Sequence, residues 1–404
     1  MAENRICLNM IVKNESRIIE RCINSFYHLI DTWCIVDTGS TDGTQEIIKE
    51  LLKDKPGELI ESPWVNFGHN RNEALRHAER WGEWTLLTDA DMVLVDDGFN
   101  KDELNPDVCG YDVIQDNYGT RYYNFRLLNS SRKWQCVGVT HEYYSPAEGM
   151  KTRGKLESLH FNDISDGGSK GDKFERDIAL LEQGIIDEPE NHRYMFYLAQ
   201  SYRDTSNWEK AIHWYSECAK IDPWDEEKQF SEYMAGWCMC AANYPLEKIE
   251  AQLLKAWMQR PWRVEALFQL ACVYRDKAMR QQAYIAFKIC AEAEYPKNDL
   301  LFIAAAIYEG SAIDEFAISS YWAGKYEESA KACEALLGTD YGKAHKGRIL
   351  KNYWYAEKQL GVYSKEKLKD VLEKRKAKLM EDFNIKMDEL KKYREEKEQQ
   401  PFSI

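Results

Sequence analysis

Long apolar runs are missing from this 404-residue sequence: the longest, from Leu300 to Tyr308, has nine residues. A membrane-spanning helix needs about 20 predominantly apolar residues. The N-terminus also lacks a basic segment followed by an apolar stretch, which is the mark of a secretory signal peptide. We therefore expect neither a membrane span nor a secretory signal.

Closely paired cysteines are also missing, because the nearest two of the eleven are Cys238 and Cys240. A structural zinc site built from CxxC pairs is excluded by this spacing. An odd number of scattered cysteines without a signal peptide is typical of a reducing compartment, where they act as small buried apolar side chains. We expect free thiols and a cytoplasmic protein.

Basic residues are in deficit, since 54 Lys and Arg stand against 68 Asp and Glu and the formal net charge is −14. Binding to a phosphate backbone needs clustered basic residues, so a general nucleic-acid binder is disfavoured, although a local basic groove stays open. The chain is 44% hydrophobic and 13% aromatic, which excludes wholesale disorder. Its length suits two or three domains.

Residues 1–165 alternate short apolar runs with segments of helical periodicity, which predicts an α/β domain with a mostly parallel sheet. Ser16 is a possible cap for the first helix. The predicted strands cover residues 6–12, 33–36, 59–60 and 84–87, and the predicted helices cover residues 18–26, 44–52 and 71–81.

Residues 174–360 show no strand signals and instead repeat a helical pattern. Seven positions match a tetratricopeptide repeat, a 34-residue helical hairpin, and six of them recur 72 residues later. Such hairpins bury their apolar faces only by stacking. A generic helical bundle is the alternative, and residues 361–404 read as a charged C-terminal helix with a solvated face. The matching positions are Leu198, Ala199, Tyr202, Ala211, Tyr215, Cys218 and Pro223, then Leu270, Ala271, Tyr274, Ala283, Phe287 and Cys290; a degenerate unit carries Ala235, Gly236 and Pro261, and a weaker fourth unit runs from Ser319 to Leu336.

Asp89 and Asp91 follow the predicted strand 84–87 directly. Residues two apart in an extended chain project to the same side, so both carboxylates can converge at the end of the strand. Open parallel sheets bind their ligands at that edge, and hard oxygen donors suit Mg²⁺ or Mn²⁺. An exposed turn is the alternative for this pair taken alone.

The segment from Asp37 to Thr44 also lies between a strand and a helix. Its glycines allow a tight turn, and Asp42 can cap the helix that begins near Thr44. Asp37, at the end of the strand, can accept hydrogen bonds from a nucleobase or ribose. Asn14 and Glu15 follow the first strand and are expected at the same edge.

A third polar segment places Arg71 and Asn72 near the start of a helix, after the aromatic residues Trp64 and Phe67. Helix N-termini attract anions, and an arginine fork binds phosphate or ribose oxygens. A surface salt bridge is the alternative.

In combination, these stretches resemble the family-2 glycosyltransferases, which have the nucleotide-sugar-binding, Rossmann-like GT-A fold. The resemblance rests on residues 11–15, 36–44, 64–75 and 87–91. It extends to a subgroup that joins a short GT-A domain to tetratricopeptide repeats and includes the S-glycosyltransferases of bacteriocin peptides. Three further elements carry this part of the resemblance: Arg126-Leu127-Leu128, Thr140-His141-Glu142 and Leu159-His160-Phe161.

The resemblance implies roles for individual residues. Asn14, Glu15, Asp37 and Arg71 would bind the nucleoside, and Asp89 would contact ribose or a metal-bound water. Asp91 would bind the metal directly and His160 would be a further ligand, a mixed oxygen and imidazole set that favours Mn²⁺. The catalytic base would be Glu142 first, His141 second and Asp116 third.

Two departures from the family narrow the expected function. The Q-x-x-R-W motif of processive synthases is absent, which disfavours a chain-extending enzyme. The GT-A region is short, so the repeats are expected to supply part of the acceptor surface.

We therefore expect a metal-dependent transferase that moves a sugar from a nucleotide sugar, with UDP as the expected carrier, to an acceptor with inversion. The acceptor could be a protein, a peptide or a glycan. The alternatives are a non-catalytic repeat protein with a vestigial sugar-nucleotide site, and a nucleotidyltransferase. The missing basic, Gly-rich N-terminal loop disfavours the latter.

Overall fold

A computed structural model of the chain describes residues 4–117, 120–167 and 173–361, together with residues 373, 376, 377 and 380. Apart from these few positions, the charged helix predicted at 361–404 lies outside the described residues. The chain divides into two compact units, Met1–Thr205 and Ser206–Ile404. Each unit is described by itself.

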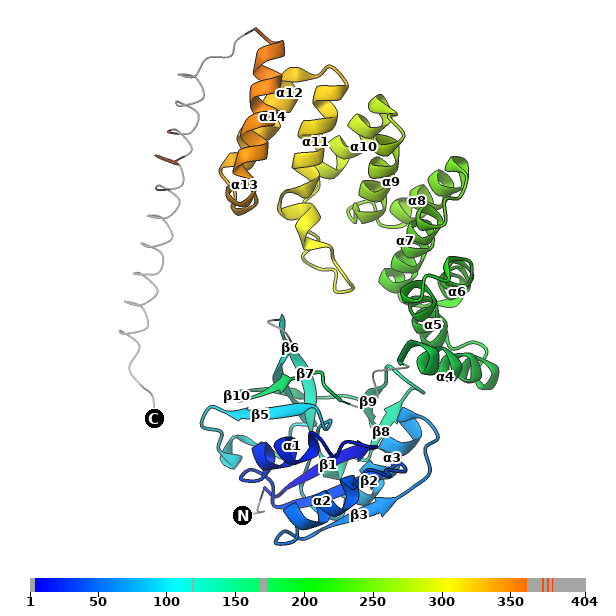
Figure 1. The fold of residues 1–404 in the computed structure, drawn as a ribbon, viewed down its shortest axis with the longest axis vertical. Helices are drawn as coiled ribbons and strands as arrows, with labels where there is room; N and C mark the ends of the chain where they lie inside the picture. The colour runs from blue at the N-terminus through cyan, green and yellow to red at the C-terminus, as the bar shows by residue number, and fades with distance from the viewer. Residues whose placement is uncertain are drawn as a thin grey trace. The chain divides into compact units, whose positions relative to one another are not determined.

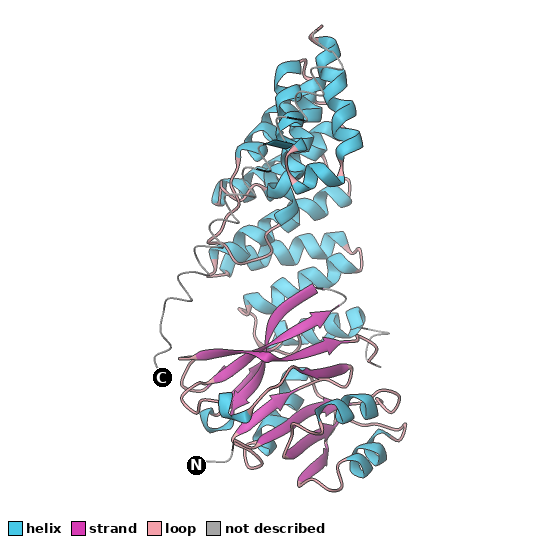
Figure 2. Ribbon diagram, turned by 90° about the vertical axis from the view of Figure 1, so that its left-hand side faces the viewer, coloured by secondary structure: helices cyan, strands magenta, loops and turns pink. Residues whose placement is uncertain are grey.

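The first unit is built on an eight-stranded sheet in the order β3-β2-β1-β4-β7-β6-β10-β5 (Figures 1 and 2). Strands β3, β2, β1 and β4 run parallel, whereas β7 is antiparallel to both β4 and β6. A separate two-stranded sheet pairs β8 with β9. The strands are β1 (Ile6–Val12), β2 (Thr32–Asp37), β3 (Gly57–Glu61), β4 (Trp84–Leu87), β5 (Met92–Asp96), β6 (Gly110–Asn117), β7 (Thr120–Asn129), β8 (Trp134–Val137), β9 (Tyr143–Pro146) and β10 (Arg153–Asp163).

Helices cover both faces of the sheet, as the alternation of side chains along β1 requires. Leu8 and Met10 belong to the core that packs against α1 (Ile19–Phe26) and α2 (Thr44–Leu51). On the opposite face, Cys7 packs with Ala78 of α3 (Phe67–Ala78), and the Asn9 side chain donates to the Ala74 carbonyl at 3.0 Å. This layering confirms the predicted α/β class.

The structure differs from the prediction at two helix starts. Helix α3 begins at Phe67, four residues before the predicted start. The Asn66 side chain caps this earlier start by accepting a hydrogen bond from the His69 amide at 2.8 Å. Ser16 does not cap α1; its backbone N–H instead donates to Asp42 at 3.0 Å. Both contacts depend on loops that periodicity does not reveal.

Two helices complete the first unit: α4 (Lys173–Asp187) and α5 (His192–Asp204). Gly184 of α4 permits a close approach, because a Cβ there would lie 3.0 Å from the Tyr194 ring and 3.2 Å from Val139 Cγ2. The helical hairpin therefore packs directly on the loop that precedes β9.

The second unit is helical throughout its described part, and its helices pair in antiparallel neighbours (Figure 1). The predicted repeat positions Ala211, Tyr215, Leu270 and Phe287 are almost fully buried, which confirms their packing role. Its helices are α6 (Trp208–Ile221), α7 (Asp225–Ala241), α8 (Leu246–Gln259), α9 (Glu265–Asp276), α10 (Arg280–Glu292), a π-helical segment (Ile307–Ser311), α11 (Ala312–Trp322), α12 (Tyr326–Leu337), α13 (Asp340–Ala344) and α14 (Lys346–Gln359).

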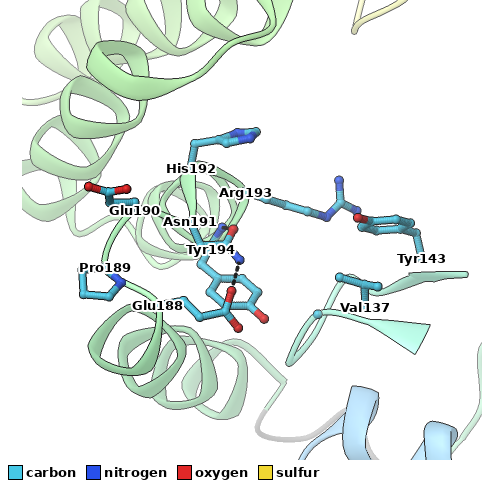
Figure 3. A pocket seen from close by; sticks show the side chains of 10 residues that line it. Val137, Tyr143, Glu188, Pro189, Glu190, Asn191, His192, Arg193 and Tyr194 are labelled. Atoms are coloured by element: carbon cyan, nitrogen blue, oxygen red, sulfur yellow. Dashed lines mark hydrogen bonds between the residues drawn. The ribbon is translucent and has the colours of Figure 1, made fainter. Parts of the chain in front are cut away.

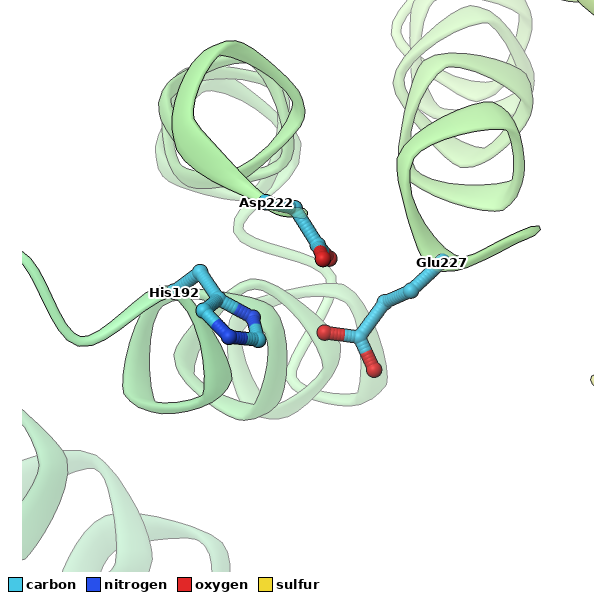
Figure 4. A group of neighbouring side chains, drawn as sticks. All are labelled: His192, Asp222 and Glu227. Carbon is cyan, nitrogen blue, oxygen red and sulfur yellow. The ribbon is translucent and has the colours of Figure 1, made fainter. Parts of the chain in front are cut away.

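The turn between α6 and α7 illustrates how these hairpins are closed (Figure 4). Asp222 follows α6 and accepts a hydrogen bond from the Trp224 amide at 2.7 Å. Glu227 lies in the first turn of α7, where a carboxylate is favoured by the helix dipole. An acidic side chain therefore lies at the end of α6, and another lies at the start of α7.

All eleven cysteines are free, and nine of them are buried, as the sequence predicts. Within the described ranges, no helix has the length and apolar character needed to cross a membrane.

Replacing Gly68 by Ala should loosen the contact between α3 and the loop before β9. An added Cβ would overlap the Gly138 carbonyl, a backbone atom that cannot swing away. We expect the free energy of unfolding in urea to fall by about 1–3 kcal/mol. Gly347→Ala is the matched control: its Cβ would meet nothing within 4 Å, so it should be neutral or slightly stabilising. Equal stability of the two variants would contradict the contact.

Candidate active site

Asp89, which follows β4, is held by two arginines from different elements. Arg71 Nη2 of α3 donates to Oδ1 at 2.7 Å, and Arg126 Nη1 of β7 donates to Oδ2 at 3.3 Å. Burial alone would raise the pKa of Asp89, but the two guanidinium groups hold it well below its ordinary value. Asp89 is therefore a fixed carboxylate with both oxygens engaged.

Arg71 also reaches a second carboxylate. Its Nε donates to Glu142 Oε1 at 2.6 Å, and both side chains are nearly buried. Burial would lower the pKa of Arg71, but Asp89, Tyr144 and Glu142 raise it well above its ordinary value. The structure thus joins three predicted site residues, Arg71, Asp89 and Glu142, in one charged network.

Arg126 and Gln115 extend this network on the side of β6. Arg126 Nη2 donates to Gln115 Oε1 at 2.9 Å, and Gln115 Nε2 donates to Asp163 Oδ2 at 3.2 Å. Arg126 belongs to a motif that carries the family resemblance, whereas Gln115 was not predicted as a site residue. The sequence offered no distinct signal for Gln115, because β6 also carries Asp112, Asp116 and Asn117.

Asp37 ends β2 and is almost fully buried, with 1% of its surface exposed. Its Oδ1 accepts from the Gly39 amide at 2.9 Å, the Ser40 amide at 2.8 Å and Gln45 Nε2 at 2.9 Å. Burial opposes ionisation, but these hydrogen bonds lower the pKa of Asp37 below its ordinary value. Its Oδ2 is buried and has no partner in the described part of the chain. A buried acceptor of this kind fits an N–H or O–H of a ligand.

The loop after β1 is tied to the loop after β2. Asn14, with φ of 56°, accepts from the Thr41 amide at 2.8 Å through Oδ1. The Glu15 amide donates to Thr44 Oγ1 at 2.8 Å. Asn14 and Glu15 therefore lie at the same strand-end edge of the sheet as Asp37.

Asp91 and Glu15 both lie close to Gly167. A Cβ built on Gly167 would lie 3.2 Å from Asp91 Oδ2 and 3.6 Å from Glu15 Oε1. Two neighbouring carboxylates are a donor set that fits Mg²⁺ or Mn²⁺. These residues would hold a divalent cation.

His160 is not brought to Asp91. It lies opposite Val95 in the β10–β5 pairing, whereas Met92, the residue after Asp91, lies opposite Asp163. Three residues along a strand span about 10 Å. The Nδ1 atom of His160 instead lies 3.0 Å from Asp97 Oδ2. The predicted metal-ligand set of Asp89, Asp91 and His160 is therefore not assembled, because the register of β10 on β5 places His160 beside Asp97.

The two other candidate bases also point away from Asp89. The two neighbours of Asp116 on β6, Gln115 and Asn117, both donate to Asp163. Because side chains alternate between the two faces of a strand, Asp116 lies on the opposite face. His141, with φ of 50°, stacks on the ring of Tyr197 with centroids 4.1 Å apart. Of the three, the structure brings only Glu142 to the network.

A pocket of about 910 Å³ lies between the β8–β9 region and the connection from α4 to α5 (Figure 3). Val137, Gly138 and Tyr143 form one wall, and residues 188–194 form the other. Tyr143 is 46% exposed and lies under the guanidinium of Arg193, 5.1 Å from it. Aromatic and arginine side chains of this kind are frequent anchors in binding sites. Sequence reasoning did not identify this pocket.

The first part of the chain is similar to known glycosyltransferases. The family model for Glycosyl transferase family 2 matches residues 7–146, a range that includes Asp37, Arg71, Asp89 and Glu142. The SPbeta prophage-derived glycosyltransferase SunS of Bacillus subtilis is 26% identical over 220 residues, which cover 51% of this chain and 51% of SunS. The chain thus spans about half the length of this curated relative.

Two further similarities concern repeat proteins. A TPR repeat-containing protein of Synechococcus elongatus is 34% identical over 96 residues, covering 24% of this chain and 22% of that protein. The crystal structure of a tetratricopeptide repeat protein from Parabacteroides merdae covers 46% of this chain and 66% of its own, with 14% identity and a TM-score of 0.33.

Replacing Arg71 by Met should lower the free energy of unfolding by about 3 kcal/mol at pH 7, because Asp89 and Glu142, two partly buried carboxylates, lose their shared partner. The folded-state pKa of Asp89 is depressed, so this stabilisation is present above its ordinary pKa of about 4 and is lost as the pH falls below it. Urea titrations should show the same difference in unfolding free energy between variant and wild type at pH 7 and pH 5, and a smaller difference at pH 3.

Arg5→Met is the control for that series, since the Arg5–Glu83 pair is exposed on both sides. It should cost at most about 1 kcal/mol. A constant difference for Arg71→Met across the pH range would contradict the assigned ion pair.

Proposed function

We propose, from the glycosyl transferase family 2 domain at residues 7–146, that the chain transfers a sugar from a nucleotide sugar to an acceptor. The observation that carries the proposal is the single charged network in which Arg71 joins Asp89, at the end of β4, to Glu142. The donor would lie along the strand ends, and Glu142 would face the acceptor.

Asp37 supports a nucleoside at this edge. Its unpartnered, buried Oδ2 would accept from the base or ribose, while its Oδ1 is already held by the turn and by Gln45. Only one oxygen of Asp37 is available, and uracil offers a single ring N–H, whereas guanine offers a ring N–H and an adjacent amino group. We therefore propose UDP as the carrier.

A nucleoside diphosphate leaving group brings negative charge close to Asp89, Asp91 and Glu15. A divalent cation held by Asp91 and Glu15 would supply positive charge at the diphosphate when bound. Arg71 and Arg126 neutralise Asp89 and Glu142, so this neighbouring network would not repel the diphosphate. The cation would then supply the positive charge that stabilises the leaving group.

Glu142 is the base that we propose for the acceptor. Direct displacement with inversion needs a group that removes the acceptor proton. The carboxylate of Glu142 shares Arg71 with Asp89, so it lies next to the donor site. His141 and Asp116 face other surroundings and are set aside for this role.

The acceptor side is proposed to include the pocket between the β8–β9 region and residues 188–194. Its volume suits a segment larger than a single side chain. The stacked helices of the second unit suit an extended protein or peptide partner. A non-catalytic repeat protein with a vestigial nucleotide site is the second candidate, favoured only by the length of the repeat region.

Nucleotide binding separates these candidates. In a thermal-shift panel of nucleoside diphosphates and nucleotide sugars with Mn²⁺, UDP should give the largest shift, equivalent to about 2.7 kcal/mol at 100 times its dissociation constant. Asp91→Ala should abolish the metal-dependent part of the shift, whereas Asp97→Ala, at the ion pair with His160, should not. A larger shift with GDP would overturn the UDP assignment, and no response to any nucleotide would favour the scaffold.

Glu142→Gln should lower the turnover of UDP-sugar hydrolysis by roughly 10²–10⁴-fold. The amide keeps an oxygen for Arg71 but cannot take a proton. The UDP thermal shift should stay at the wild-type value. Asp116→Asn is the control and should hydrolyse the donor at the normal rate, so a comparable loss in both variants would argue against Glu142 as the base.

A further inference from the structure

We infer that Arg193 and Tyr197 of helix α5 are positioning residues for Glu142, so that the first helical hairpin is part of the catalytic apparatus. The inference rests on the proposed function for the role of Glu142. Its structural part, the holding of residues 138–143 by α5, stands on contacts alone.

The loop from Gly138 to Glu142 lies between two groups of helices within the first unit. On the donor side, the Phe67 amide at the start of α3 donates to the Val139 carbonyl at 3.1 Å. Arg71, one turn further along α3, binds Glu142. These contacts draw the loop toward Asp89, but they involve only its second and last residues.

The opposite side of the loop is held by α5. The His141 ring stacks on Tyr197 with centroids 4.1 Å apart and planes 4° from parallel. Arg193 Nη2 donates to the His141 carbonyl at 2.8 Å. The guanidinium of Arg193 lies 5.1 Å from the Tyr143 ring and 4.8 Å from the Tyr197 ring. Glu142 is thus flanked by two residues, His141 and Tyr143, that α5 holds.

Helix α4 adds a contact in the middle of the loop. Thr140 Oγ1 donates to Oδ1 of Asp177 at 3.3 Å, and Asp177 is 2% exposed. Residues 139 to 143 therefore each contact an element outside the loop. A loop held on both sides in this way presents the Glu142 carboxylate in one direction.

The backbone shows why such support is needed. His141 has φ of 50°, and Gly138 has φ of 117°. A left-handed conformation at a residue other than glycine costs of order 1–3 kcal/mol and persists only where the surroundings determine it. At His141 those surroundings are Tyr197 and Arg193. Removing either should let residue 141 relax and turn Glu142 away from Arg71.

Small displacements of a catalytic group have large effects on rate, since about 1 Å of misplacement can cost 10²-fold. Arg193 and Tyr197 contact the loop at His141 and Tyr143, on the side opposite to α3. Their loss should therefore change turnover and leave donor affinity unchanged.

The test uses the full-length chain with Arg193→Ala, Tyr197→Ala and the conservative Tyr197→Phe. UDP release from the UDP sugar that wild type hydrolyses fastest gives kcat and KM. We expect kcat to fall at least 10-fold for the two alanine variants, with KM and the UDP thermal shift unchanged. Tyr197→Phe keeps the stacked ring and should restore kcat. Arg203→Ala, at the other end of α5 and bonded to Asp204, is the matched control and should behave as wild type.

Hydrogen–deuterium exchange of the same variants makes the inference independent of activity. Amides in residues 138–143 should exchange faster in both alanine variants, while those of β1 and β4 keep their wild-type rates. Unchanged exchange in the loop would overturn the inference. A variant that loses UDP affinity and melting temperature along with kcat would also overturn it, because the effect would then be general destabilisation. If wild type neither binds UDP nor releases it from a UDP sugar, the proposed function is refuted. Faster exchange of residues 138–143 in the alanine variants would then still support the holding of the loop by α5.

Discussion

The ion pairs of Arg71 are the interaction on which the candidate site depends. Arg71 binds Asp89 through Nη2 and Glu142 through Nε, and Arg126 binds the other oxygen of Asp89. Two positive and two negative charges therefore balance within a nearly buried space. Without the arginines, two carboxylates this close would repel each other and any diphosphate nearby. The start of α3 sets this arrangement, because the cap at Asn66 determines where Arg71 lies.

The same helix start links the fold to the site. Gly68 lets α3 approach Gly138 closely, so the loop that carries Glu142 is built against the helix that carries Arg71. The other face of that loop rests on α5. An α/β layer and a helical hairpin thus meet at one short segment of irregular backbone, which is where functional residues often lie on a rigid scaffold.

Much of the fold could be predicted because its signals are local. The apolar run of β1 and the polar turn after β2 mark strands and helices within a few residues of their observed bounds, and Asp89 and Asp37 fall at strand ends as expected. Long-range register could not be predicted. His160 and Asp116 lie on β10 and β6, two strands that the residue pattern did not predict. The side of the sheet on which each side chain lies could therefore not be predicted. The Gln115–Arg126 contact likewise depends on the pairing of β6 with β7.

The compact first unit ends after Thr205, not after the last strand of the sheet. Anyone exchanging repeat arrays to redirect the chain toward a new target would therefore have to keep α4 and α5 with their own sheet and join the foreign helices at the α5–α6 connection. A junction placed before Lys173 would exchange α4 and α5, which contact Thr140 and His141, together with the helices of the second unit. Modular evolution of such chains meets the same constraint, because the segment that can be recombined is shorter than the helical region.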